Sequence, residues 1–286
     1  MILDKEFVKD KLPKRFSHQN KGDFGHVLVI GGSVGMCGSV CMTAMAALRS
    51  GAGLVTVAVP EEISSVVSVK LTESMVLPVP SENGTFCLKS VGKIRKFLPK
   101  VNTVVVGMGG RICDGLEAII EMLLNEFSGT IITDADGLNI LSRNKCLLDV
   151  KRKGSLVLTP HPGEMSRLTS LSVSDIQNDR KNIAQSFAKK HNCIMVLKGE
   201  KTVITDGKLT FVNPTGNVGM ATAGSGDVLA GIIAGLSAQG SNPFELAACG
   251  CFLHGFSGDI AVSDKTEYCL VATDLIDYLP KAFLSL

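Results

Sequence analysis

The chain has 286 residues, which is enough for one large α/β domain or two small ones with a substantial core. Its 29 basic and 27 acidic residues leave a net charge of +2, so it lacks the charge excess that favours nucleic acid or a membrane surface. Hydrophobic residues make up 45% and charged residues 20%, an ordinary balance for a soluble globular protein.

Strands and helices alternate through the first half of the chain. Residues 1–22 read as a short charged helix and a loop, and the apolar run at 26–30 is typical of a strand buried on both faces. Next we expect a helix at 39–50, a strand at 54–58, a helix from about 61, a short strand at 75–79, a strand at 102–107, a helix at 115–127 and a strand at 130–133.

The second half continues the alternation. We expect a strand at 155–158, two helices of which the second covers 174–191, a strand at 193–198, a hairpin of 202–205 with 209–212, and three helices from about 225 to the C-terminus. This order predicts an α/β fold with a mostly parallel central sheet. No internal repeat or Pro/Ser-rich linker marks a boundary, so we expect a single domain over 1–286.

The cysteines and the chain start bear on location. Nine cysteines are scattered without any Cys-x-x-Cys pair, which excludes zinc-site spacing and fits reduced thiols in a reducing cytosol. Residues 1–15 alternate charged with apolar side chains and lack the apolar core of a signal peptide. The most apolar long stretch, 228–238, is too short to span a bilayer, and a cytoplasmic location is expected.

Unusual residues gather directly after the predicted strands, at Gly31-Gly32, Gly107–Gly110, Asp134–Asp136, Pro160–Glu164 and Lys198-Gly199. The carboxyl ends of strands in an open α/β sheet are where ligands bind. Asp134 and Asp136 either cap a short helix near Gly137 or serve a magnesium ion or a substrate hydroxyl. His161, between two prolines, is equally readable as helix-start chemistry or as a ligand contact.

The stretch Ala223-Gly-Ser-Gly-Asp227 precedes an apolar helical face and carries a second set of alternatives. A helix that starts there directs free N–H groups and its positive dipole end at an anion such as phosphate, and glycines let the backbone approach a ligand. Alternatively, the glycines only make a turn and Asp227 only caps the helix. A P-loop and a Gly-x-Ser-x-Gly elbow are both absent.

Other residues are assigned structural roles. His26 and His191 are expected to be structural, and His254 lies on an apolar segment typical of a core or an interface. Gly231 and Gly235, four residues apart, are expected to permit close helix packing.

Taken together, several motifs resemble one known family. Asn213–Asn217 with Ala223–Asp227 resembles the glycine-aspartate signature of the ribokinase-like superfamily, whose fold is a three-layer α/β/α sandwich. Adding Lys21-Gly22, Gly31-Gly32-Ser33, the stretch 46–55, Asp134–Asn139, 158–164 and 196–199 makes the whole chain similar to the ADP-dependent (S)-NAD(P)H-hydrate dehydratase family. Only about 20 residues precede the first core strand, which resembles the stand-alone form without the epimerase domain.

The resemblance implies a metabolite-repair reaction. Hydrated NADH or NADPH (NADHX or NADPHX) is dehydrated, and ADP is cleaved to AMP and phosphate after transient phosphorylation of the substrate hydroxyl. It implies Asp227 as the catalytic base, a Mg²⁺ ion on the nucleotide phosphates, a separate NAD(P)HX epimerase and a homo-tetramer, for which helices near 244–262 offer an interface. ADP against ATP, and NADHX against NADPHX, are left open.

The resemblance also implies the contacts. The adenine nucleotide is expected along Lys198, Gly199, Glu200, Lys201, Thr202, Gly224, Ser225 and Gly226, and the hydrated dinucleotide at Ser39, Gly109, His161 and Asp227. Many relatives have Ala at the position of Ser39, and Gly-Pro-Gly-Leu-Gly is common where this chain reads Gly107-Met-Gly-Gly-Arg111. Arg111 is therefore a candidate for an additional phosphate contact.

Two other functions stay open. A small-molecule kinase of the same superfamily, such as a hydroxyethylthiazole or pyridoxal kinase, would use the same Asp227 and keep the phosphorylated product. A nucleotide-binding sensor would bind without turnover.

Overall fold

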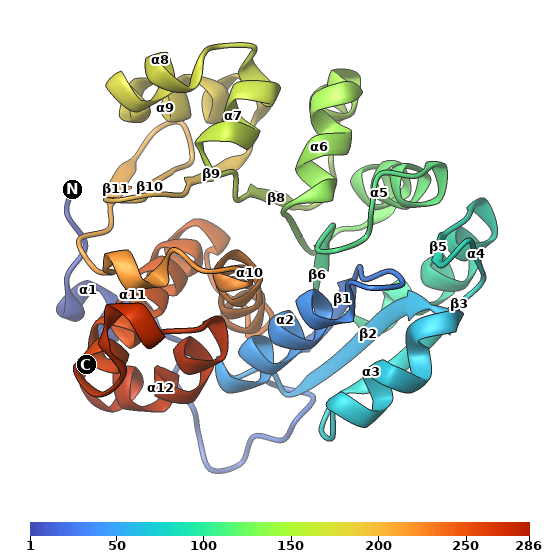
Figure 1. Cartoon of the computed structure of the whole chain (residues 1–286), viewed down its shortest axis with the longest axis horizontal. Helices are drawn as coiled ribbons and strands as arrows, with labels where there is room; N and C mark the ends of the chain where they lie inside the picture. Colours follow the sequence, from blue (N-terminus) through green and yellow to red (C-terminus); the bar gives the residue numbers. More distant parts are fainter.

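The computed structural model describes all 286 residues, and it is organised around one nine-stranded sheet of order β11-β10-β9-β8-β7-β6-β1-β2-β3 (Figure 1). The strands are β1 (His26–Ile30), β2 (Leu54–Pro60), β3 (Met75–Val79), β6 (Thr103–Val106), β7 (Thr130–Thr133), β8 (Ser155–Leu158), β9 (Ile194–Leu197), β10 (Val203–Thr205) and β11 (Thr210–Val212). The pairs from β3 to β9 are all parallel, whereas β10 pairs antiparallel with β9 and β11.

Helices cover both faces of this sheet. They are α1 (Lys5–Lys11), α2 (Cys37–Arg49), α3 (Ser64–Lys70), α4 (Leu88–Phe97), α5 (Asp114–Glu126), α6 (Asp136–Arg143), α7 (Pro162–Thr169), α8 (Val173–Asn178), α9 (Arg180–His191), α10 (Ser225–Ser237), α11 (Pro243–Cys269) and α12 (Ala272–Leu284). Short 3₁₀ turns lie at Glu61–Ile63, Leu98–Lys100, Lys145–Asp149 and Val218–Met220, and a small hairpin pairs β4 (Ser81–Glu82) with β5 (Thr85–Phe86).

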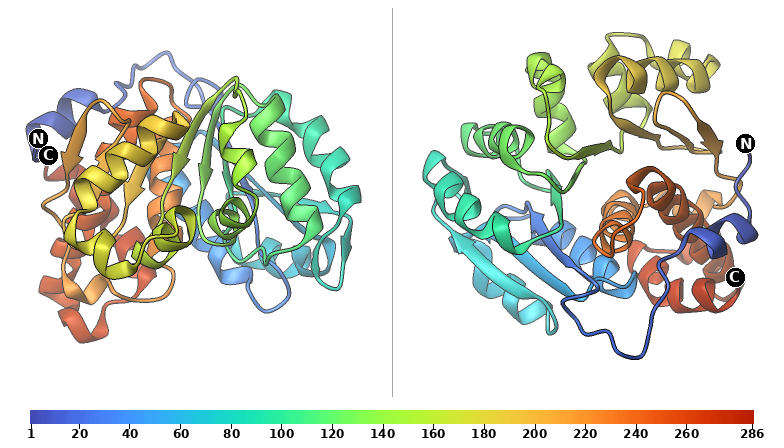
Figure 2. Two further views of the ribbon diagram at one scale, coloured as in Figure 1. Left: turned by 90° about the horizontal axis from the view of Figure 1, so that it is seen from above. Right: turned by 180° about the vertical axis from the view of Figure 1, so that it is seen from behind.

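Two hydrophobic clusters fill the spaces on either side of the sheet. Val27 and Val29 of β1 belong to the cluster under α2, α10, α11 and α12, whereas Leu28 and Ile30 belong to the cluster under α4 to α9. This split follows from the alternation of side chains along a strand. The two further views in Figure 2 show the same two helical layers, so the predicted three-layer α/β/α architecture and mostly parallel sheet are confirmed.

The predicted elements match the observed ones with a few corrections. The helix predicted at 174–191 is two helices, α8 and α9, because the backbone of Asp179 (φ −141°, ψ 50°) leaves the helical region between them. Sequence reasoning also missed α4 and the β4–β5 hairpin. The predicted hairpin at 202–212, the strand at 75–79 and the helix near Gly137 are all present.

Close packing of α10 on α2 depends on glycine. A Cβ on Gly231 would lie 2.3 Å from the carbonyl oxygen of Thr43, and a Cβ on Gly235 would lie 2.3 Å from that of Ala47. Contacts under 3.0 Å to backbone atoms cannot be accommodated without moving the helices apart. The predicted packing role of Gly231 and Gly235 is therefore confirmed.

Helix α11 is long and apolar enough to cross a membrane by length and composition, but 67% of its most apolar window is buried inside the protein. Burial of that kind is typical of a core helix. The expectation that helices near 244–262 offer an oligomer interface is therefore wrong for most of the segment, because Phe244, Leu246 and Leu253 are buried within the chain.

Histidines and cysteines outside the strand ends take structural roles, as predicted. His26 Nε2 lies 2.8 Å from the Thr56 hydroxyl, and His191 Nδ1 lies 2.8 Å from Asp149 Oδ1. Burial lowers the pKa of His26, which keeps its ring neutral at pH 7. All nine cysteines are free thiols.

Candidate functional site

The glycine-rich stretch forms the start of α10, as the sequence indicates. Gly224 lies just before the helix with φ +91°, in the left-handed region that glycine adopts without strain, and Ser225 opens the helix. A Cβ on Gly226 would lie 3.3 Å from Lys198 Nζ and 3.5 Å from Asp134 Oδ2. The helix start therefore faces a lysine and a carboxylate, and a side chain at residue 226 would crowd the space between them.

Lys198 is the centre of a partly buried charge cluster. Its Nζ donates to Asp134 Oδ1 at 2.7 Å and lies 3.8 Å from Glu164 Oε2, and only 18% of its side chain is exposed. Burial favours the neutral amine, but the carboxylates of Asp134, Glu164 and Asp227 outweigh burial and raise the pKa of Lys198. Lys198 is therefore a fixed positive charge at neutral pH.

Asp227, in the first turn of α10, is a carboxylate in an unfavourable environment. Burial and the nearby charge of Asp134 raise the pKa of Asp227 to about 7, although Lys198 and a hydrogen bond from Ser39 favour its charged form. The Asp227 carbonyl also accepts a hydrogen bond from the Thr43 hydroxyl at 3.1 Å, which ties it to α2. A carboxylate that titrates near neutral pH is suited to accept a proton from a substrate hydroxyl.

Ser39 lies beside this carboxylate, and Gly109 lies against Ser39. Gly109 has φ +60°, and a Cβ there would lie 3.0 Å from Ser39 Oγ and 2.9 Å from the Met36 carbonyl oxygen. Its own carbonyl oxygen accepts a hydrogen bond from the Ser33 hydroxyl at 2.8 Å. The β6–α5 and β1–α2 loops are thus in direct contact, and a larger residue at 109 would push them apart.

His161 caps the N-terminus of α7, which is one of the two roles that the sequence suggests for it. Its Nδ1 accepts hydrogen bonds from the backbone N–H of Gly163 at 3.0 Å and of Glu164 at 3.4 Å, while Glu164 Oε2 accepts from the His161 N–H. Burial, with the nearby charges of Lys198 and Arg167, lowers the pKa of His161. The His161 side chain is half-exposed, and its Nε2 lies 3.6 Å from Glu164 Oε1.

The predicted nucleotide-binding residues after β9 form an exposed loop. Glu200 and Lys201 are exposed, Gly199 has φ +140°, and the Thr202 hydroxyl donates to the Gly199 carbonyl at 3.0 Å. Sequence reasoning missed Arg180, whose Nη2 donates to the carbonyls of Leu197 at 2.8 Å and Lys198 at 3.2 Å. No motif marks Arg180, because it lies at the start of α9, 18 positions before Lys198.

The Asn213–Asn217 motif is an anchor for the loop before α10. Asp259 of α11 accepts hydrogen bonds from the Gly216 N–H at 2.9 Å and from Asn217 Nδ2 at 3.0 Å. His254, also on α11, lies 3.0 Å from the Ser225 carbonyl oxygen through Nε2. Burial lowers the pKa of His254 to about 4, so it is a neutral core residue that supports the helix start.

Asp136 holds a loop together. Its Oδ2 accepts the backbone N–H of Arg111 at 2.9 Å, and its Oδ1 accepts from Asn139 Nδ2 at 3.3 Å. No group of three or more His, Cys, Asp or Glu side chains in the chain is arranged to hold a metal ion.

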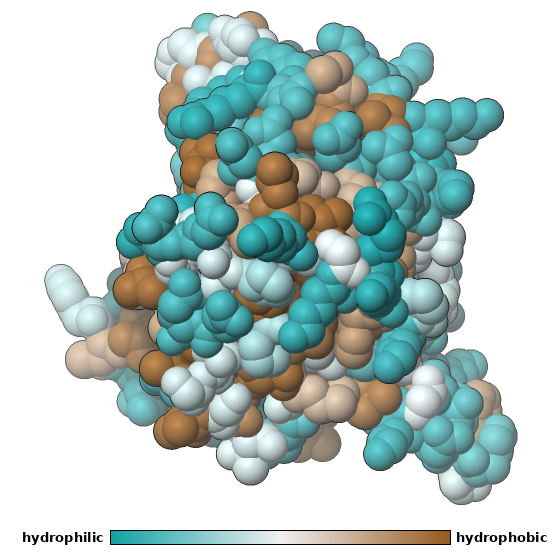
Figure 3. Space-filling model, turned by 90° about the vertical axis from the view of Figure 1, so that its right-hand side faces the viewer, coloured by the Kyte–Doolittle hydropathy of each residue, from teal (hydrophilic) through white to brown (hydrophobic).

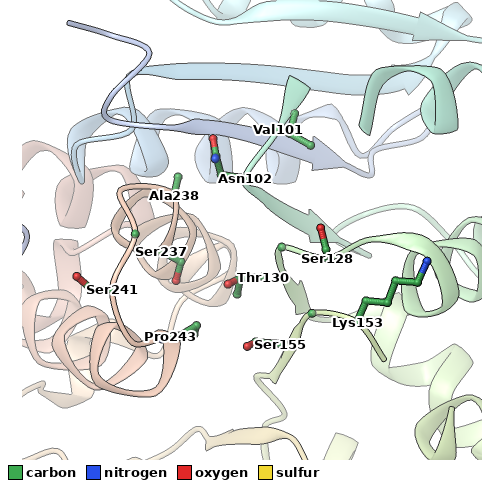
Figure 4. Close-up of a pocket in the computed structure, with 13 residues that line it drawn as sticks. Val101, Asn102, Ser128, Thr130, Lys153, Ser155, Ser237, Ala238, Ser241 and Pro243 are labelled. Atoms are coloured by element: carbon green, nitrogen blue, oxygen red, sulfur yellow. The ribbon is translucent and has the colours of Figure 1, made fainter. Parts of the chain in front are cut away.

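One open cavity lies away from this cluster. A polar, open depression of about 500 Å³ lies at the amino ends of β6, β7 and β8, lined by residues that include Asn102, Thr130, Lys153, Ser155 and Ser237 (Figure 4). The charge cluster lies at the carboxyl ends of the same strands. We assign the candidate site by its charges and glycines, because ligands of open α/β sheets bind at the carboxyl ends.

Comparison with known proteins agrees with this geometry. The family model described as NAD(P)H-hydrate dehydratase matches residues 27–281. The bifunctional NAD(P)H-hydrate repair enzyme of Moorella thermoacetica is 40% identical over 98% of this chain and 53% of its own length, so the chain spans about half the length of such relatives. The ADP-dependent (S)-NAD(P)H-hydrate dehydratase of Neisseria meningitidis is 36% identical over 86% of this chain and 80% of its own.

Solved structures give the same result. The ADP/ATP-dependent NAD(P)H-hydrate dehydratase of Bacillus subtilis, co-crystallised with ATP and Mg²⁺, superposes with a TM-score of 0.85 at 26% identity over 99% of this chain and 98% of that one. A ribokinase-like superfamily protein of Enterococcus faecalis gives 0.87 at 28% identity over 99% and 95%. With its ribokinase-like fold and the glycine-aspartate start of α10, the chain belongs to the NAD(P)H-hydrate dehydratase family.

Proposed function

We propose that this protein dehydrates (S)-NADHX and (S)-NADPHX to NADH and NADPH, with cleavage of ADP to AMP and phosphate. The observation that carries the proposal is the partly buried carboxylate of Asp227, with a pKa of about 7, at a helix start that faces Lys198. The family membership of the chain and the ADP dependence in the name of the Neisseria relative support the choice of substrates.

The reaction has two steps. Asp227 takes the proton of the substrate hydroxyl as that oxygen attacks the terminal phosphorus of ADP, and AMP leaves. The ring nitrogen lone pair of the phosphorylated substrate then expels phosphate, and loss of a proton from the adjacent carbon restores the reduced nicotinamide. Hydroxide is a poor leaving group and phosphate is a good one. Phosphorylation of the substrate hydroxyl at a kinase-like site therefore makes the dehydration easier.

The other site residues have positioning roles in this proposal. The N–H groups of Gly224, Ser225 and Gly226 stabilise the transferring phosphoryl group together with the fixed charge of Lys198. The exposed loop from Gly199 to Thr202 lies along the adenosine of the nucleotide. Ser39, Gly109 and His161 contact the hydrated dinucleotide around Asp227, a placement supported by the Ser39 hydrogen bond to that carboxylate.

A Mg²⁺ ion fits the donor set if the nucleotide phosphates and water provide most of its ligands. Mg²⁺ in nucleotide sites is commonly held by one or two carboxylates plus phosphates, and Asp134 and Glu164 are the carboxylates beside the helix start. When bound, the ion neutralises charge on the phosphates.

The alternative, a small-molecule kinase of the same superfamily, has weaker support. The hydroxyethylthiazole kinase of Pyrococcus horikoshii superposes with a TM-score of 0.64 at 17% identity, a likeness of fold alone. The superposed dehydratase of Bacillus subtilis has a higher TM-score, 0.85, and a higher identity, 26%. The kinase reading is retained only as an outcome of the assay.

The proposal extends to location and assembly. We propose a cytoplasmic location. We also propose that the protein works with an NAD(P)HX epimerase activity, because the relative from Moorella thermoacetica is a bifunctional repair enzyme. We also propose a homo-tetramer. Val69 of α3, Met75 of β3 and Leu88 of α4 are exposed large apolar side chains beside the free edge of β3. Figure 3 shows the face on this side, where hydrophobic and hydrophilic residues are interspersed.

One assay tests the function. Purified protein is given hydrated NADH or NADPH with ADP or ATP, and the return of reduced-nicotinamide absorbance is followed together with AMP, ADP and phosphate. Asp227→Asn should lose turnover by at least a hundredfold while keeping its affinity for ADP. Absence of recovery with the wild-type protein, or near-normal turnover of Asp227→Asn, would refute the proposed function or the proposed base.

A further inference from the structure

Arg111 is a cation that the fold leaves without an acidic partner. Its side chain is exposed, and its guanidinium makes one hydrogen bond, from Nη2 to the Val34 carbonyl at 3.1 Å. A guanidinium carries five N–H donors, and no carboxylate lies within ion-pair distance of this one. Most of its capacity to bind an anion is therefore unused within the chain.

The backbone holds this cation in a defined place at some conformational cost. Arg111 has φ +55°, in the left-handed region that glycine fills without strain, and its N–H donates to Asp136 Oδ2 at 2.9 Å. Through these two bonds it joins the loops after three neighbouring strands, β7, β6 and β1. The side chain is thus fixed at the carboxyl edge of the sheet, two residues beyond Gly109.

Its position separates Arg111 from the nucleotide end of the site. Lys198 and Gly199 follow β9, and the sheet order puts β8 and β7 between β9 and β6. Three strand spacings of about 4.8 Å separate β9 from β6 by roughly 14 Å. The Lys198 ammonium reaches back to Asp134 after β7, whereas the loop Gly199–Thr202, expected along the adenosine, follows β9. Arg111 lies two residues beyond Gly109, which is in contact with Ser39. An anion bound by Arg111 therefore lies on the side of Ser39, away from the adenosine loop.

The surroundings of Arg111 suit a phosphate attached to a sugar or a ring. Val34, whose carbonyl binds the guanidinium, and Ile112, the next residue in the chain, are 50% and 36% exposed, so apolar surface is open near the cation. Gly35 lies in the same β1–α2 loop with no atom within 4 Å of the position of a Cβ, which leaves room on this side. An extended phosphorylated ligand can pack on the apolar side chains while its phosphate pairs with the guanidinium.

We propose that Arg111 binds a phosphate group of the hydrated dinucleotide and so contributes to recognition of that substrate. The inference rests on the proposed function and adds a residue to it. The dinucleotide offers two sources of this chemistry, the pyrophosphate in both substrates and the 2′-phosphate in NADPHX alone. Bidentate pairing of arginine with phosphate serves either source.

The test compares Arg111→Leu, which removes the charge, with Arg111→Lys, which keeps it. We expect Arg111→Leu to raise the KM of the hydrated substrate by about tenfold or more, as for loss of a charge-assisted hydrogen bond, with kcat within twofold and the KM of ADP unchanged. Arg111→Lys should recover part of the loss. Lys153→Leu, at the opposite edge of the sheet, is the matched control for removal of a surface charge.

Comparison of NADHX with NADPHX distinguishes the pyrophosphate from the 2′-phosphate as the group that Arg111 binds. A rise in KM for NADPHX alone identifies the 2′-phosphate, and an equal rise for both identifies the pyrophosphate. A direct measurement uses the stable products NADH and NADPH as probes. Because the chain has no tryptophan, their fluorescence can be titrated without energy transfer from that residue. Their dissociation constants should rise with the corresponding KM values.

Three outcomes would overturn the inference. These are unchanged KM and unchanged product affinity in Arg111→Leu, a loss of kcat alone, which would mean that Arg111 only orders the loops, and a rise in the KM of ADP alone. Each presupposes a wild-type protein that dehydrates the substrate. Failure of the proposed function would instead be seen as an inactive wild-type protein.

Discussion

Asp227 shows how a single side chain is tuned by where a helix begins. Burial and the proximity of Asp134 work against its charge, and Lys198 and Ser39 only partly restore it. The result is a base that is matched to neutral pH, where general-base catalysis is most effective. The same residue at an exposed helix start would remain a weak base and serve only as a cap.

This tuning predicts a pH dependence. The base must be unprotonated to act, and its pKa is raised to about 7, so kcat/KM should fall about tenfold per unit as the pH decreases below 7 and level off above it. The profile is measured between pH 5.5 and 9 with the hydrate concentration well below KM. A flat profile between pH 6 and 8 would contradict the assignment of Asp227 as the base. The residual activity of Asp227→Asn should lack this limb, which serves as the control.

At the scale of elements, the contact of α10 with α2 is the feature most sensitive to substitution. Gly231→Ala should destabilise the protein by about 1–3 kcal/mol, because the new methyl group would meet the Thr43 carbonyl oxygen. This loss should appear although alanine favours helices over glycine by about 1 kcal/mol. Urea unfolding followed by circular dichroism measures the change in the free energy of unfolding.

Gly92→Ala is the matched control for that prediction. Gly92 lies inside α4, is exposed, and has no atom within 4 Å of the position of its Cβ. The same chemical change should therefore stabilise the protein by up to about 1 kcal/mol. Stabilisation by both substitutions would show that helix propensity, and not close packing, decides the effect at Gly231.

The elements that the sequence predicts well are those with strong local signals. β1, β7 and β8 have apolar centres and are followed within two residues by glycine, aspartate or proline, and their bounds are predicted correctly. The boundary between α8 and α9 is not predictable in this way. Neither Asn178 nor Asp179 is a glycine or a proline, and the break arises from the backbone of Asp179.

Candidate site residues also divide into those that a local sequence signal reveals and those that only the fold brings together. Gly226 and Asp227 are adjacent in sequence, so a motif reveals them. The pairing of Lys198 with Asp134 joins positions 64 apart, and only the order of the sheet brings them together. Arg180 and Asp259 are harder still to identify from the sequence. They lie on other helices and support the site by hydrogen bonds to backbone carbonyl and N–H groups.

At the scale of the whole molecule, ligand binding should be measurable as stability. At an ADP concentration of 100 times its Kd, binding to the folded state alone contributes about 2.7 kcal/mol, which corresponds to a rise in Tm of roughly 5 °C for a chain of this size. Differential scanning fluorimetry with and without ADP and Mg²⁺ measures this rise. Lys198→Ala should lose most of it, because the fixed charge that faces the start of α10 is gone.

The readout in that experiment is the ligand-induced shift. Lys198→Ala also leaves Asp134 buried without its partner, so the Tm of the free variant should itself be lower. Lys153→Ala, in the depression at the opposite edge of the sheet, should keep the full shift. A full ADP-induced shift in Lys198→Ala would contradict the placement of the nucleotide at Lys198.

The close approach of α10 to α2 has a consequence for motion. Backbone carbonyls of α2 lie against Gly231 and Gly235, and Ser39 and Asp227 are on the first turns of these same two helices. Helices in such contact move together as a rigid body, so any closure around substrates must come from segments outside this helix pair. The distance from the Ser39 hydroxyl to the Asp227 carboxylate is therefore set before a ligand binds. Little reorganisation of these two groups is then needed during the reaction.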